Sequence, residues 1–438
     1  MRIFEYPLGL CRTDICPGSF TALISAVLPK GNQGTTVLKK PFISRRVAIG
    51  AVLIAVSMLS AACGSGGSDR SGVDPTARAA AVDKARAGAM ELINAGKLPN
   101  TWKGPDTSPA PRSGIKLTII PEQMASTGSS RPAQAIEAEA KKLGWSAKIS
   151  DGQGKAEVQL NALNTAVDEK ADAVILIFVD TTRVQSALRR ALAAGVKVVT
   201  LGSLKNTPET VPDVSFDWLR AGEAIAQYAV WKSGGDLGML QMRNTDLYIT
   251  VNGQYKGSQE YLEQEANCPG CDIVTKDWSL ATFDDPTIGP AAQAVATLLA
   301  DSSLNWVSCF DSCLFRVSNG LDRAGFSEKV SGAGYDCNPE NLDIIRSGGP
   351  QKVCFADPRE WLAYAAIDNV NRMTNGLPAF DYTKALPVAL FDKESLDALP
   401  AQQARELEIT GWQGNYDFRA KFEELWGLRS PAREAGHP

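Results

Sequence analysis

Short apolar runs alternate with amphipathic helical segments twice along this chain, once between residues 115 and 201 and again between 237 and 335. The run 173–179 is almost entirely apolar, so both faces of the corresponding strand are expected to be buried. Strands joined through helices are parallel, and such crossovers are right-handed. The pattern predicts two parallel sheets, each covered by helices on both faces.

The two series have the same plan. In the first, the predicted strands are 116–121, 147–150, 173–179 and 196–201, and the predicted helices are 132–143, 156–169 and 183–194. In the second, the strands are 237–242, 272–276, 306–310 and 329–335, and the helices are 252–265, 290–300 and 314–324. The sequence therefore predicts the α/β class, with two Rossmann-like lobes built on parallel sheets. Because ligands collect at the carboxyl ends of parallel strands, we expect the lobes to be hinged around a ligand cleft.

An apolar run at residues 47–62 follows Lys39, Lys40, Arg45 and Arg46 and ends at Cys63. A basic segment, a short apolar core and small residues before a cysteine are typical of an export signal, and the cysteine indicates a lipoprotein. A retained membrane anchor is the alternative, but a spanning helix needs about 20 apolar residues. We expect an extracytoplasmic protein that is anchored to the cell membrane by a lipid on Cys63.

The part of the chain that follows this signal is longer than a single hydrophobic core usually supports. An Ala-rich segment at 75–96 predicts a helix, and the prolines at 99–114 indicate a linker. The expected organisation is an N-terminal extension and signal peptide (1–62), a lipid-anchored spacer with helix and linker (63–114), the first lobe in part (115–220), the second lobe in part (221–350), and a crossover helix with a C-terminal tail (351–438).

Charge and composition exclude several classes of function. The formal net charge of -4 offers no basic field for a nucleic acid. The only histidine, His437, lies next to the C-terminus, which removes the residue most used for acid–base catalysis and metal binding. The chain also has no Gly-rich phosphate loop of the type G-x-x-x-x-G-K-[ST]. We expect no enzymatic activity, no cofactor and no metal.

Several short motifs resemble, in the right order, the periplasmic-binding-protein type I superfamily, the ribose-like solute-binding lipoproteins of ABC transporters. They are 171–176, 184–194, 194–201, Ala333-Gly334-Tyr335-Asp336, and Phe355-Ala356-Asp357-Pro358 before the helix 361–375. The resemblance implies capture of a small, sugar-like organic solute between two lobes and its delivery to a permease, whose partner ATPase hydrolyses ATP. An aromatic or other organic acid is the alternative ligand. A ligand sensor for a membrane signalling protein and an extracytoplasmic enzyme are the alternative functions.

The resemblance also implies where ligand contacts lie. Asp336 keeps the hydrogen-bond acceptor of the sugar-binding members, whereas Ser203, Phe310 and Ala356 replace polar residues of that pattern. Such losses favour a flatter, less polar ligand, for which Arg243 would be the carboxylate partner. The candidate ligand-binding residues are Glu122, Gln123, Asp151, Asp180, Ser203, Trp218, Arg243, Asn244, Tyr248, Asn252, Phe310, Asp311, Asp336 and Ala356.

Some of these candidates can instead be explained by a structural role, without any contact to a ligand. Asp151 and Asp180 precede predicted helices, and short polar side chains cap helices by accepting hydrogen bonds from free N–H groups. Trp218 can stack on a ligand or pack in the core. Both interpretations stay open at the level of the sequence.

Six cysteines follow the predicted signal and its cysteine, and an even number outside the cytoplasm favours disulfides. Local pairing is the simplest arrangement: Cys268 with Cys271, Cys309 with Cys313, and Cys337 with Cys354. The spacing of Cys268 and Cys271 is also that of a thiol–disulfide oxidoreductase, but here the pair follows a predicted helix instead of preceding one. A zinc site of four thiolates is a further alternative.

Overall fold

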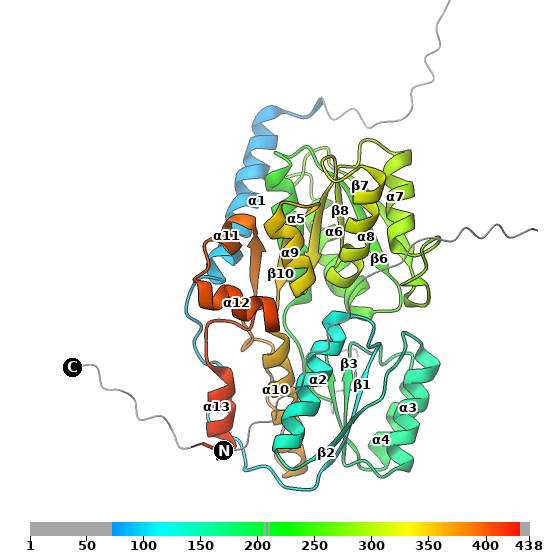
Figure 1. The fold of residues 1–438 in the computed structure, drawn as a ribbon, viewed down its shortest axis with the longest axis vertical. Coiled ribbons are helices and arrows are strands. Elements are labelled where there is room, and N and C mark those ends of the chain that lie inside the picture. Colours follow the sequence, from blue (N-terminus) through cyan, green and yellow to red (C-terminus); the bar gives the residue numbers. More distant parts are fainter. Residues whose placement is uncertain (1–71, 205–206, 209–210, 430–438) are drawn as a thin grey trace, which may run out of the picture. The chain divides into compact units, whose positions relative to one another are not determined.

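The computed structural model describes residues 72–204, 207–208 and 211–429. The predicted export signal and Cys63 lie outside the described residues. Within the described ranges, no helix has both the length and the apolar character that a membrane span requires. The predicted class is confirmed, because the chain forms two separate sheets of mainly parallel strands with helices packed against them (Figure 1).

The first lobe has a five-stranded parallel sheet in the order β2-β1-β3-β4-β5. Its strands are β1 (Lys116–Pro121), β2 (Ser146–Ile149), β3 (Ala173–Ile177), β4 (Lys197–Leu201) and β5 (Asp213–Val214). Its helices are α2 (Thr127–Lys142), α3 (Ala156–Asp168) and α4 (Gln185–Ala193). All five residues of β3 are buried, as its uninterrupted apolar sequence predicts. Helix α2 begins before the predicted residue 132 because Pro132 is accommodated inside it.

The second lobe has a six-stranded sheet in the order β11-β10-β9-β8-β6-β7. Its strands are β6 (Gly238–Asn244), β7 (Asp272–Trp278), β8 (Trp306–Phe310), β9 (Ser331–Tyr335), β10 (Gln351–Ala356) and β11 (Ala389–Asp392). Its helices are α5 (Trp218–Lys232), α6 (Lys256–Leu262), α7 (Pro290–Ala300), α8 (Asp311–Ala324) and α9 (Pro339–Ser347). The expectation of an all-parallel sheet is wrong at one edge, where β11 pairs antiparallel with β10.

One predicted helix, 252–265, has a different form. It begins as a π-helical turn, η2 (Thr250–Tyr255), which continues into α6. Gly253 and Gly257 lie where α5 comes close, since a Cβ at Gly257 would meet the carbonyl oxygen of Leu219 at 2.0 Å. π-Helical turns of this kind are frequently found at functional sites.

Segments from both ends of the described chain pack onto the lobes. Helix α1 (Pro75–Ala95) contacts α5 and β11, and α10 (Arg359–Thr374) contacts α2 and β4 of the first lobe. The C-terminal helices are α11 (Lys393–Asp397), α12 (Ala401–Thr410) and α13 (Phe418–Leu425). Helix α12 packs on α9 of the second lobe and α13 on α10 of the first, so the tail contacts both lobes.

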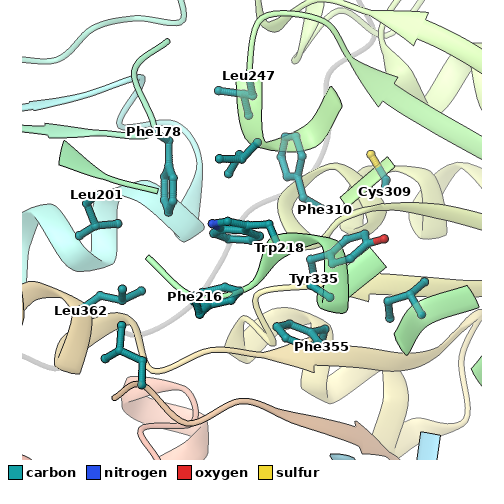
Figure 2. Packing of buried hydrophobic residues seen from close by; sticks show 14 of the residues in the cluster. Phe178, Leu201, Phe216, Trp218, Leu247, Cys309, Phe310, Tyr335, Phe355 and Leu362 are labelled. Carbon is teal, nitrogen blue, oxygen red and sulfur yellow. The ribbon is translucent and has the colours of Figure 1, made fainter. Parts of the chain in front are cut away.

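The larger hydrophobic core contains side chains from both lobes. Figure 2 shows Trp218 among Phe178, Phe216 and Phe310. The ring centroids of Trp218 and Phe216 are 4.1 Å apart, and the indole N–H of Trp218 donates to Oγ of Ser215 at 2.8 Å. Trp218 is therefore a core residue whose polar atom is satisfied within the protein.

The structure contains three disulfides, Cys268–Cys271, Cys309–Cys313 and Cys337–Cys354, and these are the local pairings that the sequence favours. The first closes a turn before β7, the second joins β8 to α8, and the third joins the turn after β9 to β10. All six sulfurs are bonded, so none of them is left as a thiolate for the zinc site considered above.

Candidate functional site

The carboxyl ends of β1 and β3 in the first lobe meet those of β6, β8, β9 and β10 in the second at a small cavity, and an adjoining cavity is lined by the second lobe alone. Each has a volume of about 20 Å³, and the two share Thr250, Gln254 and Phe310 in their linings. The residues that line them, called here the interlobe site, are Glu122, Ser126, Gly128, Ser129, Phe178, Gln241, Met242, Arg243, Leu247, Ile249, Thr250, Gln254, Tyr255, Ser308, Cys309, Phe310, Tyr335, Asp336 and Arg359.

The position of the interlobe site follows from the topology, because the carboxyl ends of parallel strands gather at one edge of each sheet. Its cavities are much smaller than the roughly 300 Å³ or more of a typical small-molecule site. The lobes must therefore separate before a molecule of several carbon atoms can enter.

Contacts at the rim hold the lobes together in this form. Oγ1 of Thr127 donates to Oε1 of Glu340 at 2.7 Å, and a guanidinium nitrogen of Arg183 lies 2.7 Å from Oδ1 of Asp246. Both pairs join the first lobe to the second and are partly exposed to solvent. Their net contributions are small, so they are suited to a contact that opens and closes.

Arg359 is the central charged residue of the interlobe site. It begins α10, is 1% exposed, and its guanidinium pairs with Asp336 and, through Nε, with Oδ1 of Asp357 at 2.5 Å. The same guanidinium lies over the ring of Phe178, 4.7 Å from its centroid. Its Nη1 has no hydrogen-bond partner among the described residues.

The backbone of the turn after β9 positions the side chain of Asp336. Asp336 has φ 94° and Cys337 has φ 48°, in the left-handed region that side chains other than glycine rarely adopt. The disulfide of Cys337 to Cys354 and the hydrogen bond from the backbone N–H of Asp336 to the carbonyl of Phe355, at 2.8 Å, hold this turn. Strained backbone that is held in this way is typical of functional sites.

Phe178 follows β3 and also has a positive φ, 56°. A Cβ added at Gly202 would meet the Phe178 ring at 2.3 Å, so a glycine at the end of β4 leaves the room that this ring occupies. The ring thereby lies under the guanidinium of Arg359.

Glu122 is the second unusual ionisable residue of the interlobe site. Burial raises the pKa of its carboxyl to about 8, although the neighbouring Ser129 hydroxyl and the charge of Arg359 act in the opposite direction. Oγ of Ser129 donates to Oε1, whereas Oε2 has no hydrogen-bond partner within the described part of the chain. Near neutral pH this carboxyl is mainly protonated and can donate a hydrogen bond through its free oxygen.

The other carboxyls nearby are also shifted by burial. Burial raises the pKa of Asp357 to about 7, against the lowering effect of Arg359, and raises the pKa of Asp336. Burial, together with the charge of Asp336, raises the pKa of Asp311 well above its ordinary value. Asp311 accepts hydrogen bonds from the backbone of Asn338 and the side chain of Gln351, each at 2.9 Å, so its role is to hold the ends of β8 and β9.

Of the residues proposed from the sequence, Glu122, Arg243, Phe310 and Asp336 line the interlobe site. Arg243 is already occupied, since Nε and Nη2 pair with the two carboxylate oxygens of Asp277 at 2.6 and 2.8 Å. Ten further candidates do not line the two cavities: Gln123, Asp151, Asp180, Ser203, Trp218, Asn244, Tyr248, Asn252, Asp311 and Ala356.

Asp151 and Asp180 are not helix caps, which corrects the structural interpretation of these residues. The N-caps of α3 and α4 are Lys155 and Val184. Asp151 instead accepts hydrogen bonds from the backbone N–H groups of Met124 and Gln153, and Asp180 from that of Thr182. Short acidic side chains stabilise turns in this way when they precede a helix by several residues.

Two more candidates shape loops near the site. Oδ1 of Asn244 accepts from the backbone N–H groups of Asp246 and Leu247, at 3.0 and 3.1 Å, and this turn carries Leu247 to the interlobe site. The backbone N–H of Ser203 donates to Oδ1 of Asp213 at 2.8 Å. Both residues position backbone without lining a cavity.

Sequence reasoning missed Arg359 and the apolar residues Phe178, Leu247 and Ile249. The available signal for Arg359 was its place directly after Asp357-Pro358, between the crossover motif and the predicted helix 361–375. For the apolar residues no local signal existed, since an apolar side chain after a strand is as compatible with core packing as with a cleft.

Residues 118–378 match a family model described as a periplasmic binding protein domain, which covers more than half of the chain. The chain belongs to this family. A sequence comparison with curated proteins gives no match. The family consists of extracytoplasmic solute-binding proteins without enzymatic activity, so this binding protein has a solute-binding role.

Solved structures with the same fold include several described as sugar or polyol binders. An ABC sugar transporter subunit from Rhodobacter sphaeroides has 19% identity and a TM-score of 0.57, and the match covers 64% of this chain and 99% of that one. A Caulobacter myo-inositol binding protein with bound myo-inositol has 20% identity, a TM-score of 0.59, and coverage of 68% and 99%. A solute binding protein from Mycobacterium smegmatis with bound glycerol has 20% identity, a TM-score of 0.57, and coverage of 66% and 97%. At these identities the likeness establishes the fold.

Proposed function

We propose that this protein captures a small organic solute between its two lobes and delivers it to the permease of an ABC import system. By family the ligand is sugar-like, as in the related structures described with bound myo-inositol or glycerol. The permease and its ATPase are the proposed partners, and the lipid on Cys63 is the proposed anchor to the cell membrane. Of the candidate residues, Glu122, Phe310 and Asp336 are the proposed ligand contacts, whereas Arg243 lines the interlobe site but pairs with Asp277.

The observation that carries the proposal is a buried site to which both lobes contribute incompletely satisfied polar atoms. Glu122 comes from the first lobe, and Gln241 comes from β6 of the second, where its Oε1 has no hydrogen-bond partner in the described residues. Arg359 begins the crossover helix between the lobes. A buried polar atom without a partner costs about 1–3 kcal/mol, which a correctly placed ligand group would recover.

Small-molecule capture can be tested by native mass spectrometry of the body 64–438. The protein is purified, incubated with a small-molecule extract of the host cells, desalted and sprayed. The proposal predicts a one-to-one adduct that is released unchanged on denaturation. Absence of any adduct would contradict solute capture, and recovery of the ligand in a chemically altered form would favour the enzyme alternative.

The anchor is tested separately in cells that express the full chain. A Cys63→Ala variant is expected to move from the membrane fraction to the soluble extracytoplasmic fraction, whereas a Ser65→Ala variant stays with the membrane. Membrane retention of Cys63→Ala would show that the apolar run itself is the anchor.

A further inference from the structure

A cavity of about 650 Å³ lies between α12 and the start of α13, and its lining comes entirely from residues 399–419. It is called here the tail pocket. Its volume is within the range of roughly 300–1,000 Å³ that is usual for a small-molecule site, whereas each cavity of the interlobe site has only about 20 Å³. The tail pocket also lies outside residues 118–378, which the family model matches. It is therefore a candidate for a second site that the solute-binding domain does not itself provide.

Aromatic side chains form much of the lining of the tail pocket. Trp412, Tyr416 and Phe418 all contribute to it. Trp412 and Phe418 are 6% and 1% exposed, and Trp412 packs on Phe391 with 6.0 Å between the ring centroids. Phe418 is stacked on Trp361 at 5.2 Å. Because packing from behind fixes these rings, the apolar surface of the pocket is formed before a ligand enters.

One hydrogen-bond donor of this lining has no partner. The indole N–H of Trp412 is buried and meets no acceptor among the described residues, although a buried indole usually finds one. The amide of the neighbouring Gln413 is engaged elsewhere: Oε1 accepts from the backbone N–H of Glu360 at 2.9 Å, and Nε2 donates to the carbonyl of Thr410 at 2.6 Å. An oxygen atom of a ligand could therefore satisfy the indole N–H and remove the cost of leaving it unpaired.

Two carboxylates of the lining lack a cationic partner in the described part of the chain. Glu406 accepts a hydrogen bond from the side chain of Gln402 at 3.2 Å, and Asp417 accepts one from the backbone N–H of Ala420 at 3.0 Å, as the N-cap of α13. Both donors are neutral, so both carboxylates keep their negative charge. Glu406 and Asp417 are exposed, and their attraction for a cation is therefore expected to weaken as salt is added.

The positive charges near the tail pocket are already compensated. Arg419, which lines it, pairs with Glu360. Arg131 of α2 lies behind the lining and is subject to the negative charges of Asp336 and Asp357. The charge that remains at the pocket is that of the two carboxylates, which favours a cationic ligand and disfavours an anionic one.

The two sides of the tail pocket are attached to different lobes. Helix α12 packs on α9 of the second lobe, whereas α13 packs on α10, which contacts α2 and β4 of the first lobe. Arg131 of α2 adds a direct link, because its guanidinium donates to the carbonyl of Thr410 at the end of α12. A hinge motion that separates the lobes would therefore move one side of the pocket relative to the other.

We propose that the tail pocket is a second binding site, for a small organic cation that carries an aromatic ring and an acceptor oxygen, and that its occupancy is linked to lobe closure. The ring packs against the aromatic side chains, the oxygen accepts from the indole N–H of Trp412, and the ammonium group lies near Glu406 and Asp417. Such a cation contacts both sides of the pocket, so it favours the lobe separation at which both are in reach. The site goes beyond solute capture and does not depend on it.

Three probes that share a hydroxyphenyl ring test the preference for a cation by isothermal titration calorimetry at pH 7 and low salt. They are tyramine, tyrosol and 4-hydroxyphenylacetate, which end in an ammonium group, a hydroxyl group and a carboxylate. Tyramine is expected to bind at least about tenfold more tightly than 4-hydroxyphenylacetate, with tyrosol between them. Lack of tyramine binding, or binding of the anion as tight as that of the cation, would overturn the proposal.

A charge-neutralising variant places this binding in the tail pocket. Glu406→Gln is expected to weaken tyramine binding by about threefold or more and to leave tyrosol unchanged. Glu394→Gln, at an exposed carboxylate of α11 outside the lining, removes the same charge and is the matched control. Equal effects of the two variants on tyramine would show that the cation binds somewhere else.

The hydrogen bond assigned to the indole is tested with Trp412→Phe, which keeps an aromatic ring but removes the N–H. Tyramine binding is expected to weaken by about fivefold. Binding of 2-phenylethylamine, which has the same ring and ammonium group without the oxygen, is expected to change little. Equal losses for the two amines would refute the hydrogen bond and indicate only a disturbed pocket.

The link to lobe closure is measured without the captured solute. Spin labels at Ser186→Cys on α4 and Ala296→Cys on α7 report the distance between the lobes from exposed positions. Saturating tyramine is expected to narrow the distance distribution in double electron–electron resonance, and this effect should be lost in Glu406→Gln at the same tyramine concentration. A distribution that tyramine leaves unchanged would refute the coupling.

Discussion

Arg359→Met tests whether the buried guanidinium is compensated as the structure indicates. Methionine keeps an unbranched apolar stem against Phe178 but removes the charge, leaving Asp336 and Asp357 at 5% and 1% exposure without their main partner. Breaking a buried ion pair by removing one member costs about 3–5 kcal/mol, because the remaining charge is buried and unpaired. We expect a loss of this size in the free energy of unfolding at pH 8.

The loss of stability in Arg359→Met should depend on pH, and the structure determines the direction of that dependence. Burial already raises the pKa of Asp357 to about 7. Without the positive charge of Arg359, which lowers that pKa, the carboxyls take up protons more readily, and a protonated pair needs no compensating charge. The destabilisation is therefore expected to be smaller at pH 5 than at pH 8.

The assay is urea denaturation followed by tryptophan fluorescence at both pH values, with the three disulfides kept oxidised. Arg190→Met, which removes an exposed arginine paired with Asp168, is the control and should change stability little at either pH. A loss below about 1 kcal/mol at pH 8, or a loss independent of pH, would refute the compensated arrangement of Arg359.

Four further predictions follow from the same geometry. The pKa of Glu122 is about 8 in the folded protein, whereas an ordinary glutamate in the unfolded chain has a pKa of about 4.3. Between these two pH values the folded protein holds a proton that the unfolded chain has released. The free energy of unfolding should therefore fall as the pH rises through this window, by up to about 1.4 kcal/mol per pH unit. Denaturation of Glu122→Gln from pH 5 to 8 should show a flatter slope, whereas the surface variant Glu137→Gln keeps the parent slope; equal slopes in the two would disprove the assignment. Two double alanine variants compare the disulfides Cys337–Cys354 and Cys268–Cys271, which span 17 and 3 residues. Loss of Cys337–Cys354 should lower the thermal midpoint more, because a longer closed loop constrains the unfolded chain more. The reverse order would contradict the role given to the β9–β10 link. Trp426→Ala should lower the free energy of unfolding by about 3–5 kcal/mol in urea denaturation, because the indole is 1% exposed and its N–H donates to Asp368 at 2.9 Å. Leu428→Ala, at an exposed position, is the control. If Trp426→Ala loses no more stability than this control, the tail is not part of the folded body. Thr127→Ala and Arg183→Ala should each raise the dissociation rate of a bound solute severalfold in stopped-flow measurements, since both remove a rim contact between the lobes; unchanged rates would argue against those contacts in closure.

The sequence was sufficient to predict the two α/β lobes, because the signal is local. Each buried strand, such as β3, is an apolar run of its own, and each helix carries its period within a dozen residues. Asp336 could also be proposed, since its place after a predicted strand matches the family pattern. The edge strand β11 could not, because its antiparallel pairing with β10 joins segments separated by an entire helix.

The interlobe site was harder to predict because its members are distant in the chain. Glu122 and Arg359 come from opposite ends of the family domain, and nothing near either residue indicates that they face one cavity. Arg243 satisfied every local criterion for a carboxylate partner, yet Asp277 on the neighbouring strand already pairs with it. The positive φ of Phe178, which sets the direction of its ring, depends on the room left by Gly202 on another strand.

Capture between lobes is tested most directly by the distance between them. Spin labels at Ser186→Cys on α4 and Ala296→Cys on α7 report on the first and second lobes from exposed positions. Double electron–electron resonance should give a broad distribution without ligand and a shorter, narrower one with the solute recovered from the native adduct, because cavities of about 20 Å³ require opening before entry and closure after it. An identical distribution with and without saturating solute would contradict hinged capture.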